Sequence, residues 1–321
     1  MNIWEKLSKP FFVLAPMDDV TDSVFRQIIV ETASPDLFYT EFVNVDGLQS
    51  PGRPKILPKL QFSNKEKPII AQIWGKIPEN YYKTTKDLIK MGYDGVDINM
   101  GCPDKAVIKN GCCVALVDNR ELAGEIIAAV KQAAGKKFSV SVKTRLGNRH
   151  EDMSWIEFLL KQDLDALIVH GRTAKEMSKV PARWDKIGQV REMRDSLSPT
   201  TKIIGNGDVM TRQQGVDLAK EYNLDGIMIG RGVFHDPYVF SPYSKWKEQS
   251  PEQKLALYQK HVQLFCDTWK NNERKIYTLN KFCKIYINDV PGAKELRDKL
   301  MHARTADELL SLLDHHPTIT K

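Results

Sequence analysis

A thiol stands in a turn at the end of an expected strand. The run Asn99-Met100-Gly101-Cys102-Pro103 directly follows a β-branched segment. No histidine flanks Cys102, and an unperturbed cysteine has a pKa of about 8.5, so the group is expected to be mostly thiol at neutral pH. Such a thiol is suited to donating a proton, which makes Cys102 the candidate general acid. A nucleophilic thiolate and a purely structural cysteine are the alternatives.

Polar side chains alternate along the neighbouring segments. Two-residue periodicity sends Ser139, Ser141, Lys143 and Arg145 to one side of an expected strand. Buried cations are costly without anionic partners, so a ligand with electron-rich oxygens is expected beside them. The same alternation turns further polar groups inward in other segments: Gln72, Asp97, Asn99 and His170.

This set suits a flat heteroaromatic ligand. Gln72 matches the hydrogen-bonding edge of a pyrimidine, and Lys143 is suited to stabilising negative charge on a reduced flavin. For His170 taken alone, a satisfied core histidine is the alternative.

Two glycine-rich loops predict a phosphate site. They are Gly205-Asn206-Gly207-Asp208 and Gly230-Arg231-Gly232, and each follows an expected strand. Their backbone N–H groups are unobstructed by side chains, and Arg231 adds a charged clamp. Tight turns without a ligand are the alternative for either loop alone.

The elements that must position these residues alternate between strand and helix. Alternation of this kind implies parallel strands joined by helices, and eight such units favour an α/β fold of the (β/α)₈ TIM-barrel type. In that fold the carboxyl ends of the strands carry the active site, with phosphate at the last two loops. The expected strands are Phe11 to Ala15, Leu37 to Phe42, Pro68 to Ile73, Gly95 to Asn99, Phe138 to Lys143, Ala166 to His170, Lys202 to Asn206 and Gly226 to Gly230. The Pro/Gly-rich stretch after the second strand predicts irregular structure in place of a helix.

The strand pattern stops near Pro237, which divides the chain into a barrel domain at 1–243 and a helical bundle domain at 244–321. A helix expected over Arg274 to Asn288 turns a basic face outward. This face favours phosphate contacts, with an ordinary solvated surface as the alternative. The residues of the basic face are Arg274, Tyr277, Lys281 and Lys284.

Composition limits the class of protein. The 321 residues carry a net charge of +6 with a pI near 8.9, which favours a polyanionic partner. No apolar run reaches the roughly 18 residues of a membrane span, and the amino terminus lacks a secretory layout, so a cytoplasmic location is expected. Five cysteines in no zinc-like spacing predict reduced thiols and no metal site.

In identity and order, these motifs resemble the tRNA-dihydrouridine synthases. The resemblance spans most of the barrel and continues into Lys281 to Arg297, which is similar to the family's tRNA-binding bundle. The motifs are Ala15-Pro16-Met17, Thr40-Glu41-Phe42, Gln72, Asn99-Met100-Gly101-Cys102-Pro103, Lys143-Thr144-Arg145-Leu146-Gly147, His170-Gly171-Arg172-Thr173, Asn206-Gly207-Asp208 and Gly230-Arg231-Gly232.

The resemblance implies a bound FMN and a tRNA substrate, with NADPH as reductant and a monomeric enzyme. A uridine flipped out of the tRNA stacks on the flavin, oriented by Asn99 and Arg145 with Lys143, and receives hydride at C6 and a proton from Cys102 at C5. The residues implied to hold FMN are Pro16, Met17, Asp18, Gln72, Lys143, His170, Asn206, Gly207, Asp208, Gly230 and Arg231.

Two departures from the family pattern concern the surroundings of the site. Cys112-Cys113 replaces small Gly or Ala residues, which affects packing near Cys102, and Met177 stands where a glutamine is common. A flavin-dependent reductase of free pyrimidines, similar to dihydroorotate dehydrogenase, and a non-catalytic RNA-binding barrel are the alternative functions. The sequence does not predict which uridine is reduced.

Overall fold

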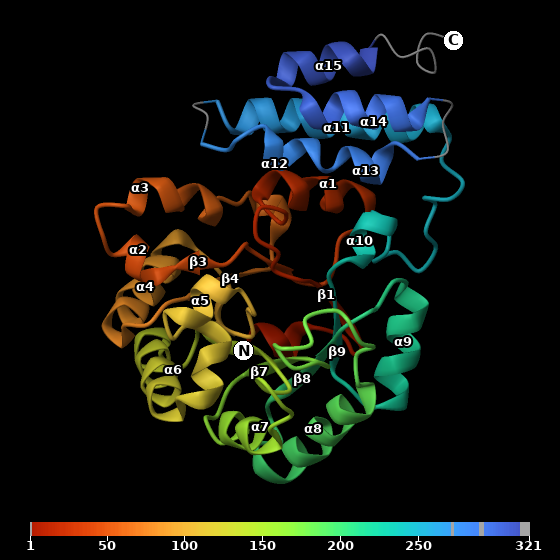
Figure 1. The fold of residues 1–321 in the computed structure, drawn as a ribbon. Coiled ribbons are helices and arrows are strands. Elements are labelled where there is room, and N and C mark those ends of the chain that lie inside the picture. Colours follow the sequence, from red (N-terminus) through yellow and green to blue (C-terminus); the bar gives the residue numbers. More distant parts are fainter. Residues whose placement is uncertain (1, 271–272, 289–291, 315–321) are drawn as a thin grey trace.

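A computed structural model describes residues 2–270, 273–288 and 292–314. Its centre is a sheet of parallel strands in the order β1-β9-β8-β7-β6-β5-β4-β2, with β3 also paired to β4. A parallel bridge between Val13 and Leu37 joins the two edges, so the sheet curls into a nearly closed barrel. The predicted TIM-barrel fold is confirmed (Figure 1). The strands are β1 (Phe11–Leu14), β2 (Phe38–Tyr39), β3 (Val43–Asn44), β4 (Ile69–Trp74), β5 (Gly95–Met100), β6 (Ser139–Arg145), β7 (Ala166–His170), β8 (Lys202–Asn206) and β9 (Gly226–Ile229).

The second predicted strand, Leu37 to Phe42, is shorter than expected: only Phe38–Tyr39 forms β2, and β3 begins beyond it at Val43. Between β2 and β3, the Thr40 hydroxyl accepts the backbone N–H of Gln72 at 3.1 Å and donates to the carbonyl of Glu41 at 2.7 Å. A side chain therefore replaces part of the main-chain ladder, and the strand is interrupted where Glu41 is buried.

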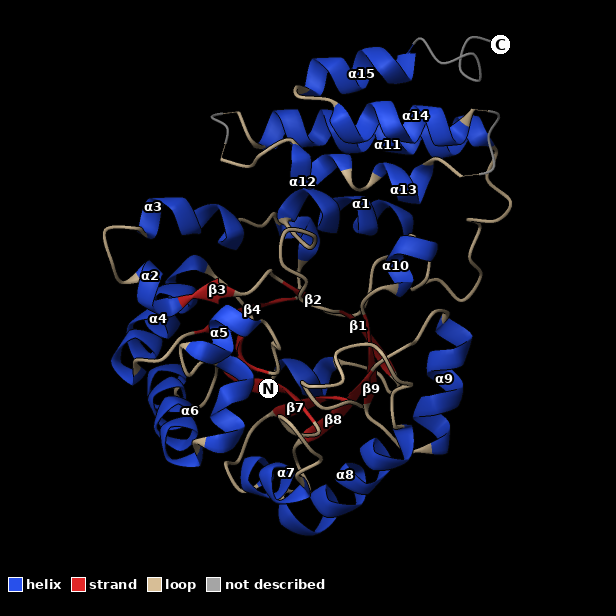
Figure 2. Ribbon diagram, in the orientation of Figure 1, coloured by secondary structure: helices blue, strands red, loops and turns tan. Residues whose placement is uncertain are grey.

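Helices cover the outside of the barrel, as Figure 2 shows. The Pro/Gly-rich stretch after β3 forms only short helical turns, so the prediction that it contains no regular long helix is confirmed. The helices up to the last strand loop are η1 (Ile3–Lys6), α1 (Ser23–Ala33), α2 (Val45–Leu48), α3 (Arg53–Ile56), η2 (Leu57–Leu60), η3 (Asn64–Glu66), α4 (Pro78–Met91), α5 (Lys105–Lys109), η4 (Cys113–Asp118), α6 (Arg120–Ala134), α7 (Met153–Leu160), α8 (Trp184–Leu197), α9 (Arg212–Glu221) and α10 (Gly232–His235).

The barrel interior is apolar at one end and polar at the other. At the amino ends of the strands, the Trp4 indole N–H donates to the Ser139 hydroxyl at 2.7 Å and plugs the barrel. At the carboxyl ends the strand register sets Asn99 beside Lys143, and Arg145 beside His170. The predicted inward direction of these side chains therefore brings them to one rim.

The C-terminal helices pack on the barrel through α1. Phe25 of α1 stacks on Phe282 with ring centroids 4.9 Å apart, and His261 lies 4.9 Å from the same ring. Burial lowers the pKa of His261 to about 3, so this histidine is a neutral member of an aromatic core that barrel and helices share. The C-terminal helices are α11 (Pro251–Thr268), α12 (Tyr277–Asn280), α13 (Cys283–Tyr286), α14 (Ala293–His302) and α15 (Ala306–Asp314).

The predicted domain boundary between residues 243 and 244 falls in the connection from α10 to α11 and stays a prediction. Among the described residues, every helix is too short or too polar to cross a lipid bilayer.

The prediction of one continuous helix over Arg274 to Asn288 is wrong. The chain instead forms α12 and α13, with backbone bonds of the i to i+3 type, such as Phe282 to Leu279 and Ile285 to Phe282. The buried Asn280 amide donates to the carbonyls of Met301 and Ala303, which ties this turn to the end of α14.

Candidate active site

A cavity of about 230 Å³ opens at the carboxyl ends of the strands. It collects nine of the eleven residues predicted to bind a cofactor: Pro16, Met17, Lys143, His170, Asn206, Gly207, Asp208, Gly230 and Arg231. Ala15, Ser178, Val209, Met210 and Met228 also line it and were not predicted. The sequence could have indicated Met228. Side chains alternate along a strand, so when Ile227 and Ile229 point outward, Met228 between them points inward.

The two glycine-rich loops form one side of this cavity. Gly207 has φ +135°, and a Cβ there would lie 2.6 Å from the Cβ of Ala182, so only glycine fits. The Asn206 amide donates to the carbonyl of Met228 at 2.8 Å, which fixes the β8 loop against β9.

An ion network holds the charged residues of these loops. Asp208 bridges Arg231, at 2.8 Å, and the buried Arg172. Burial raises the pKa of Asp208, but the hydrogen bond from Arg172, the N–H of Ala182 and the two positive charges outweigh it, so the pKa lies below its usual value. Arg231 therefore faces the cavity with one carboxylate already beside it.

His170 is neutral and carries a buried ring nitrogen without a hydrogen-bond partner. Burial, with the charges of Lys143, Arg145 and two further arginines, holds its pKa far below the ordinary value. Its Nδ1 is buried without a hydrogen-bond partner in the described part of the chain. A buried nitrogen of this kind is costly unless a ligand satisfies it, so the structure favours a bound group here.

Lys143 stays a cation in the same cavity. Burial and then Arg145 lower its pKa to about 8, while Asp97 and Cys102 act in the opposite direction. The ammonium is therefore mostly protonated at neutral pH and can stabilise negative charge on a ligand.

A chain of side-chain amides connects the barrel interior to the catalytic turn. The Gln72 amide donates to Asp97 at 2.8 Å and accepts from Asn99 at 3.0 Å. The Asn99 oxygen accepts the backbone N–H groups of Gly101 and Cys102, both at 3.0 Å. Gln72 does not line the cavity, and its amide is directed by these contacts.

Asp97, the carboxyl group at the inner end of this hydrogen-bonded series of side chains, has a pKa near neutrality. Burial raises the pKa of Asp97 to about 7, against hydrogen bonds from Ser141 and Gln72 that lower it. Asp97 was predicted to point inward, and its contact with Gln72 gives it a positioning role in the site.

Cys102 lies half-buried in the turn after β5. The pKa of its thiol is lower than the ordinary value expected from the sequence. A hydrogen bond from Cys113 is the main cause that lowers its pKa to about 7, with burial opposing and Arg145 assisting. Cys113 itself keeps its proton because burial raises its pKa well above the usual value. The expectation that Cys102 is mostly thiol at neutral pH is therefore corrected, since thiol and thiolate coexist there.

Cys113 is one of the two cysteines that stand where the family pattern has small Gly or Ala residues, and its contact with Cys102 gives it a role at this position. This residue has φ +53°, in the left-handed region, and its side chain is fully buried. A small residue or glycine would adopt this backbone with less strain, but it would leave Cys102 without its hydrogen-bond donor.

Arg145 holds the loops around the turn. Its Nε donates to the carbonyl of Gly101 at 2.9 Å, and its Nη1 donates to the carbonyls of Thr173 and Met177. The side chain of Met177 is exposed, and its backbone oxygen is what Arg145 contacts.

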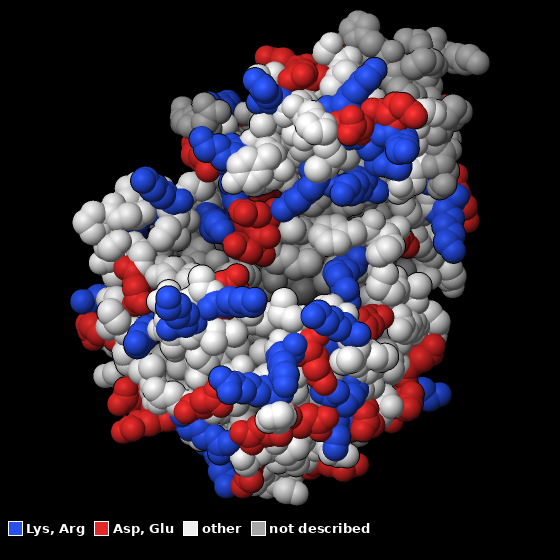
Figure 3. Space-filling view, in the orientation of Figure 1, with Lys and Arg blue, Asp and Glu red and all other residues white. Residues whose placement is uncertain are grey.

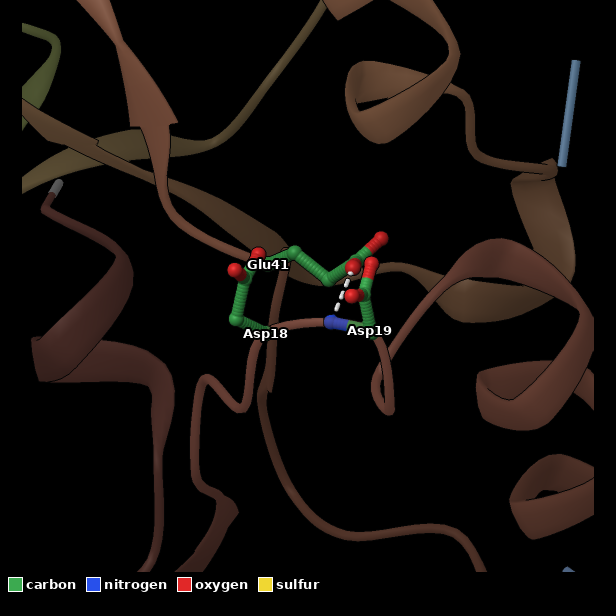
Figure 4. Close-up of side chains that lie close together, drawn as sticks. All are labelled: Asp18, Asp19 and Glu41. Atoms are coloured by element: carbon green, nitrogen blue, oxygen red, sulfur yellow. Dashed lines mark hydrogen bonds between the residues drawn. The ribbon is translucent and has the colours of Figure 1, made fainter. Parts of the chain in front are cut away.

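Asp18 and Asp19 of the β1–α1 loop form an acidic cluster with Glu41, which lies between β2 and β3 (Figure 4). The Asp19 N–H donates to Glu41 at 2.6 Å, while Lys59 pairs with Asp18. Asp18 therefore points to Lys59 and does not line the predicted cofactor cavity.

Arg274 joins this cluster, which corrects its predicted placement. Its guanidinium is 6% exposed and forms ion pairs with Asp19, at 3.1 Å, and with the fully buried Glu41. Arg274 is therefore not on an exposed basic face, because the broken helix turns it toward the barrel. Lys281 and Lys284 line a second cavity beside α10, and Lys281 stays within electrostatic reach of Arg274 and of the acidic cluster.

Comparison with known proteins identifies the family. Residues 13–320 match the family model described as "Dihydrouridine synthase (Dus)". The chain belongs to the dihydrouridine synthase family. Members of this family are oxidoreductases, and so is this enzyme.

Curated relatives of this dihydrouridine synthase agree over almost its full length. It is 43% identical to a "Probable tRNA-dihydrouridine synthase" of Staphylococcus aureus (strain COL), covering 98% of this chain and 95% of that one. It is also 43% identical to the "Probable tRNA-dihydrouridine synthase 2" of Bacillus subtilis (strain 168), covering 98% and 96%. The family resemblance predicted from the ordered motifs is confirmed.

Solved structures share the fold of this dihydrouridine synthase at low identity. Histamine dehydrogenase from Rhizobium sp. 4-9 matches with a TM-score of 0.57 at 12% identity, and the match covers 82% of this chain and 51% of that one. A 2-naphthoyl-CoA reductase matches with a TM-score of 0.59 at 12% identity, covering 78% and 52%. The chain spans about half the length of these two proteins, and the likeness shows the fold alone.

Proposed function

We propose that this dihydrouridine synthase is an FMN-dependent enzyme that reduces the C5=C6 bond of a specific uridine in tRNA, with NADPH as reductant and Cys102 as proton donor. The observation that carries the proposal is the juxtaposition of Cys102 with Lys143 and Arg145, beside a cavity that ends in a glycine-rich phosphate cradle.

The residues of the cavity fit a flavin mononucleotide. The loops at Asn206–Asp208 and Gly230 and Arg231 suit the phosphate, because they combine free N–H groups with a guanidinium. The unpaired Nδ1 of His170 and the ammonium of Lys143 suit the oxygen- and nitrogen-rich parts of the cofactor. When bound, FMN supplies the hydride.

Cys102 supplies the proton on this proposal. A general acid works best when its pKa is close to the operating pH, and a thiol with a pKa of about 7 meets that condition. Asn99 keeps the turn in place, since its side-chain oxygen holds the N–H of Cys102 itself.

Arg145 and Asn99 orient the uridine. Three of the hydrogen bonds of Arg145 go to backbone carbonyls, and its Nη2 makes no hydrogen bond to the described residues, so this group is available to a uracil oxygen. The Asn99 amide nitrogen donates one hydrogen to Gln72 and keeps a second for the base.

The tRNA partner follows from the relatives' names, and from the net charge of +6. The base must leave its stack to reach a barrel rim, so the cleft between the barrel and the C-terminal helices would hold the surrounding RNA. A monomer, a cytoplasmic location and the absence of a metal remain predictions.

The test is direct. The purified protein is incubated with NADPH and unmodified tRNA, the RNA is digested, and mass spectrometry seeks a uridine heavier by two hydrogens. A gain mapped to one position is expected. Bound FMN and NADPH oxidation without any modified RNA would contradict the tRNA substrate and favour a free-pyrimidine reductase. A protein that binds no flavin after FMN is added would favour the non-catalytic RNA-binding barrel.

A further inference from the structure

A second cavity lies between α10 and the α12–α13 segment, outside the site described above. It measures about 260 Å³ and is lined by Phe234, Lys281, Phe282, Lys284 and Ile285. None of these residues lines the cavity at the strand ends. Its place is fixed by packing, because α10 and α13 lie side by side in Figure 1 and are in contact.

Residues spaced three apart in the α12–α13 segment line this cavity. Side chains three apart lie above one another where backbone bonds run from i to i+3, as they do at Phe282 and Ile285. Lys281 and Lys284 form one column, and Phe282 and Ile285 form the next. An apolar wall therefore stands directly beside two cations.

The apolar wall is rigid. Phe282 is almost fully buried: its ring stacks on Phe25 at 4.9 Å, His261 lies 4.9 Å from it and the Lys281 ammonium lies 5.7 Å from its centroid, so the ring is held in place. Phe234 of α10 also lines the cavity. It is half-buried, and its ring centroid lies 6.4 Å from that of Phe25. Part of its ring is left facing the cavity, where a flat group can lie against it.

The rim of the cavity is positive. No carboxylate of the described residues lies within ion-pair distance of Lys281 or Lys284, and no acidic residue lines the cavity, although the charges of the nearby Asp18, Asp19 and Asp22 act on Lys281. Figure 3 shows Lys and Arg side chains on both sides of the hollow between the barrel and the C-terminal helices, together with a group of Asp and Glu side chains at one edge of it. An aromatic wall beside unpaired cations is the arrangement that holds a base of single-stranded nucleic acid with its phosphates outside.

We propose that this cavity binds one unpaired nucleobase of the tRNA, distinct from the uridine that is reduced, with Lys281 and Lys284 on the adjoining phosphates. The inference rests on the proposed function, since it needs a tRNA substrate. Phe234 follows Arg231 of the phosphate loop by three residues, so the second base is held close to the strand-end rim. Two bases captured at once fix the orientation of the RNA, and the spacing between the two cavities then helps to select the uridine.

The experiment combines protein variants with modified RNA. Phe234→Ala removes the exposed ring, and Phe234→Tyr keeps it. Phe158→Ala is the matched control, because Phe158 is also a half-buried ring but lies on α7, opposite the C-terminal helices (Figure 1). Lys284→Ala has Lys220→Ala on α9 as its charge-matched control. Flavin content and melting temperature of each full-length variant report whether it is folded.

Affinity for tRNA is measured with transcripts that carry a single abasic site at each unpaired position in turn. Loss of one stacked base weakens binding by roughly 5- to 100-fold. We expect one position, other than the reduced uridine, at which base removal weakens binding to the wild type and to Phe234→Tyr. For Phe234→Ala, removing the base at that position should not weaken tRNA binding further, because the variant already lacks the ring on which the base stacks.

The outcomes separate the two proposals. If the wild type makes no dihydrouridine, the proposed function fails. If the wild type is active but folded Phe234→Ala and Lys284→Ala bind tRNA as tightly as their controls, the base site is overturned and the function stands. The base site is equally overturned if every abasic position affects Phe234→Ala and wild type alike, since the cavity then holds no base.

Discussion

At the scale of single residues, the acidity of Cys102 depends on a neighbour that is distant in sequence. Cys113 donates the hydrogen bond that lowers the Cys102 pKa, and Arg145 adds a smaller electrostatic contribution. The proposed proton donor, Cys102, and the residue that lowers its pKa, Cys113, can therefore be tested separately.

Replacing Cys102 by alanine removes the proposed acid. We expect the single-turnover rate of uridine reduction to fall by about 10²- to 10⁴-fold, because general acid catalysis contributes that much. Flavin reduction by NADPH should be unchanged, since it requires no proton from Cys102. Rapid-mixing absorbance measures both steps, and a variant that reduces uridine at the wild-type rate would rule out the proton-donor role.

Replacing Cys113 by alanine should move the pH profile. The acid must be protonated, so the wild-type single-turnover rate should decline as pH rises through about 7. Cys113→Ala removes the main cause that lowers the Cys102 pKa, which shifts this decline to higher pH. Lys143 loses its charge above about pH 8 and adds a second decline that the variant leaves in place. Cys113→Ser keeps a donor and should resemble wild type, and identical profiles for alanine and wild type would contradict the contact.

At the scale of elements, two consecutive strand loops shape the end of the cavity that is proposed to hold a phosphate. The β8 loop needs a glycine in a left-handed conformation, and the β9 loop is held to it through Asn206.

Gly207→Ala should weaken flavin binding. Its φ of +135° and the 2.6 Å approach to Ala182 leave no room for a methyl group, and strain of this kind costs about 1–3 kcal/mol. We expect a 5- to 150-fold rise in the dissociation constant for FMN, measured by fluorescence quenching. Gly135→Ala is the control, because Gly135 also has positive φ but nothing within 4 Å, so its flavin affinity should be unchanged.

At the scale of the whole molecule, the C-terminal helices are built into the barrel. The aromatic core runs from α1 to α13, and Arg274 reaches the buried Glu41 beneath the β1–α1 loop. Removing residues after 243 would expose Phe25 and Phe234, so truncation is not a clean test of substrate class, and point variants are needed.

Arg274→Met should destabilise the protein by about 3–5 kcal/mol, because it leaves the buried Glu41 with only Lys59, 4.0 Å away, as a cationic neighbour. Denaturant unfolding measures this change, and adding Glu41→Gln to the same chain should recover much of it. Lys260→Met breaks another ion pair between α11 and α1, but that pair is exposed and should contribute at most about 1 kcal/mol. Equal losses for the two single variants would contradict a special role for the Arg274 contact.

The sequence by itself determined the barrel and most of the residues that line the cavity at the strand ends. Strand periodicity decides which side chains face inward, and the closure of parallel strands gathers them at one rim, so Lys143, His170 and the glycine loops were predictable. Only the tertiary structure decided the placement of Cys113, Arg274 and Phe234. Their roles depend on contacts between segments far apart in the chain, and on a helix interrupted by hydrogen bonds from Asn280, which no local pattern records.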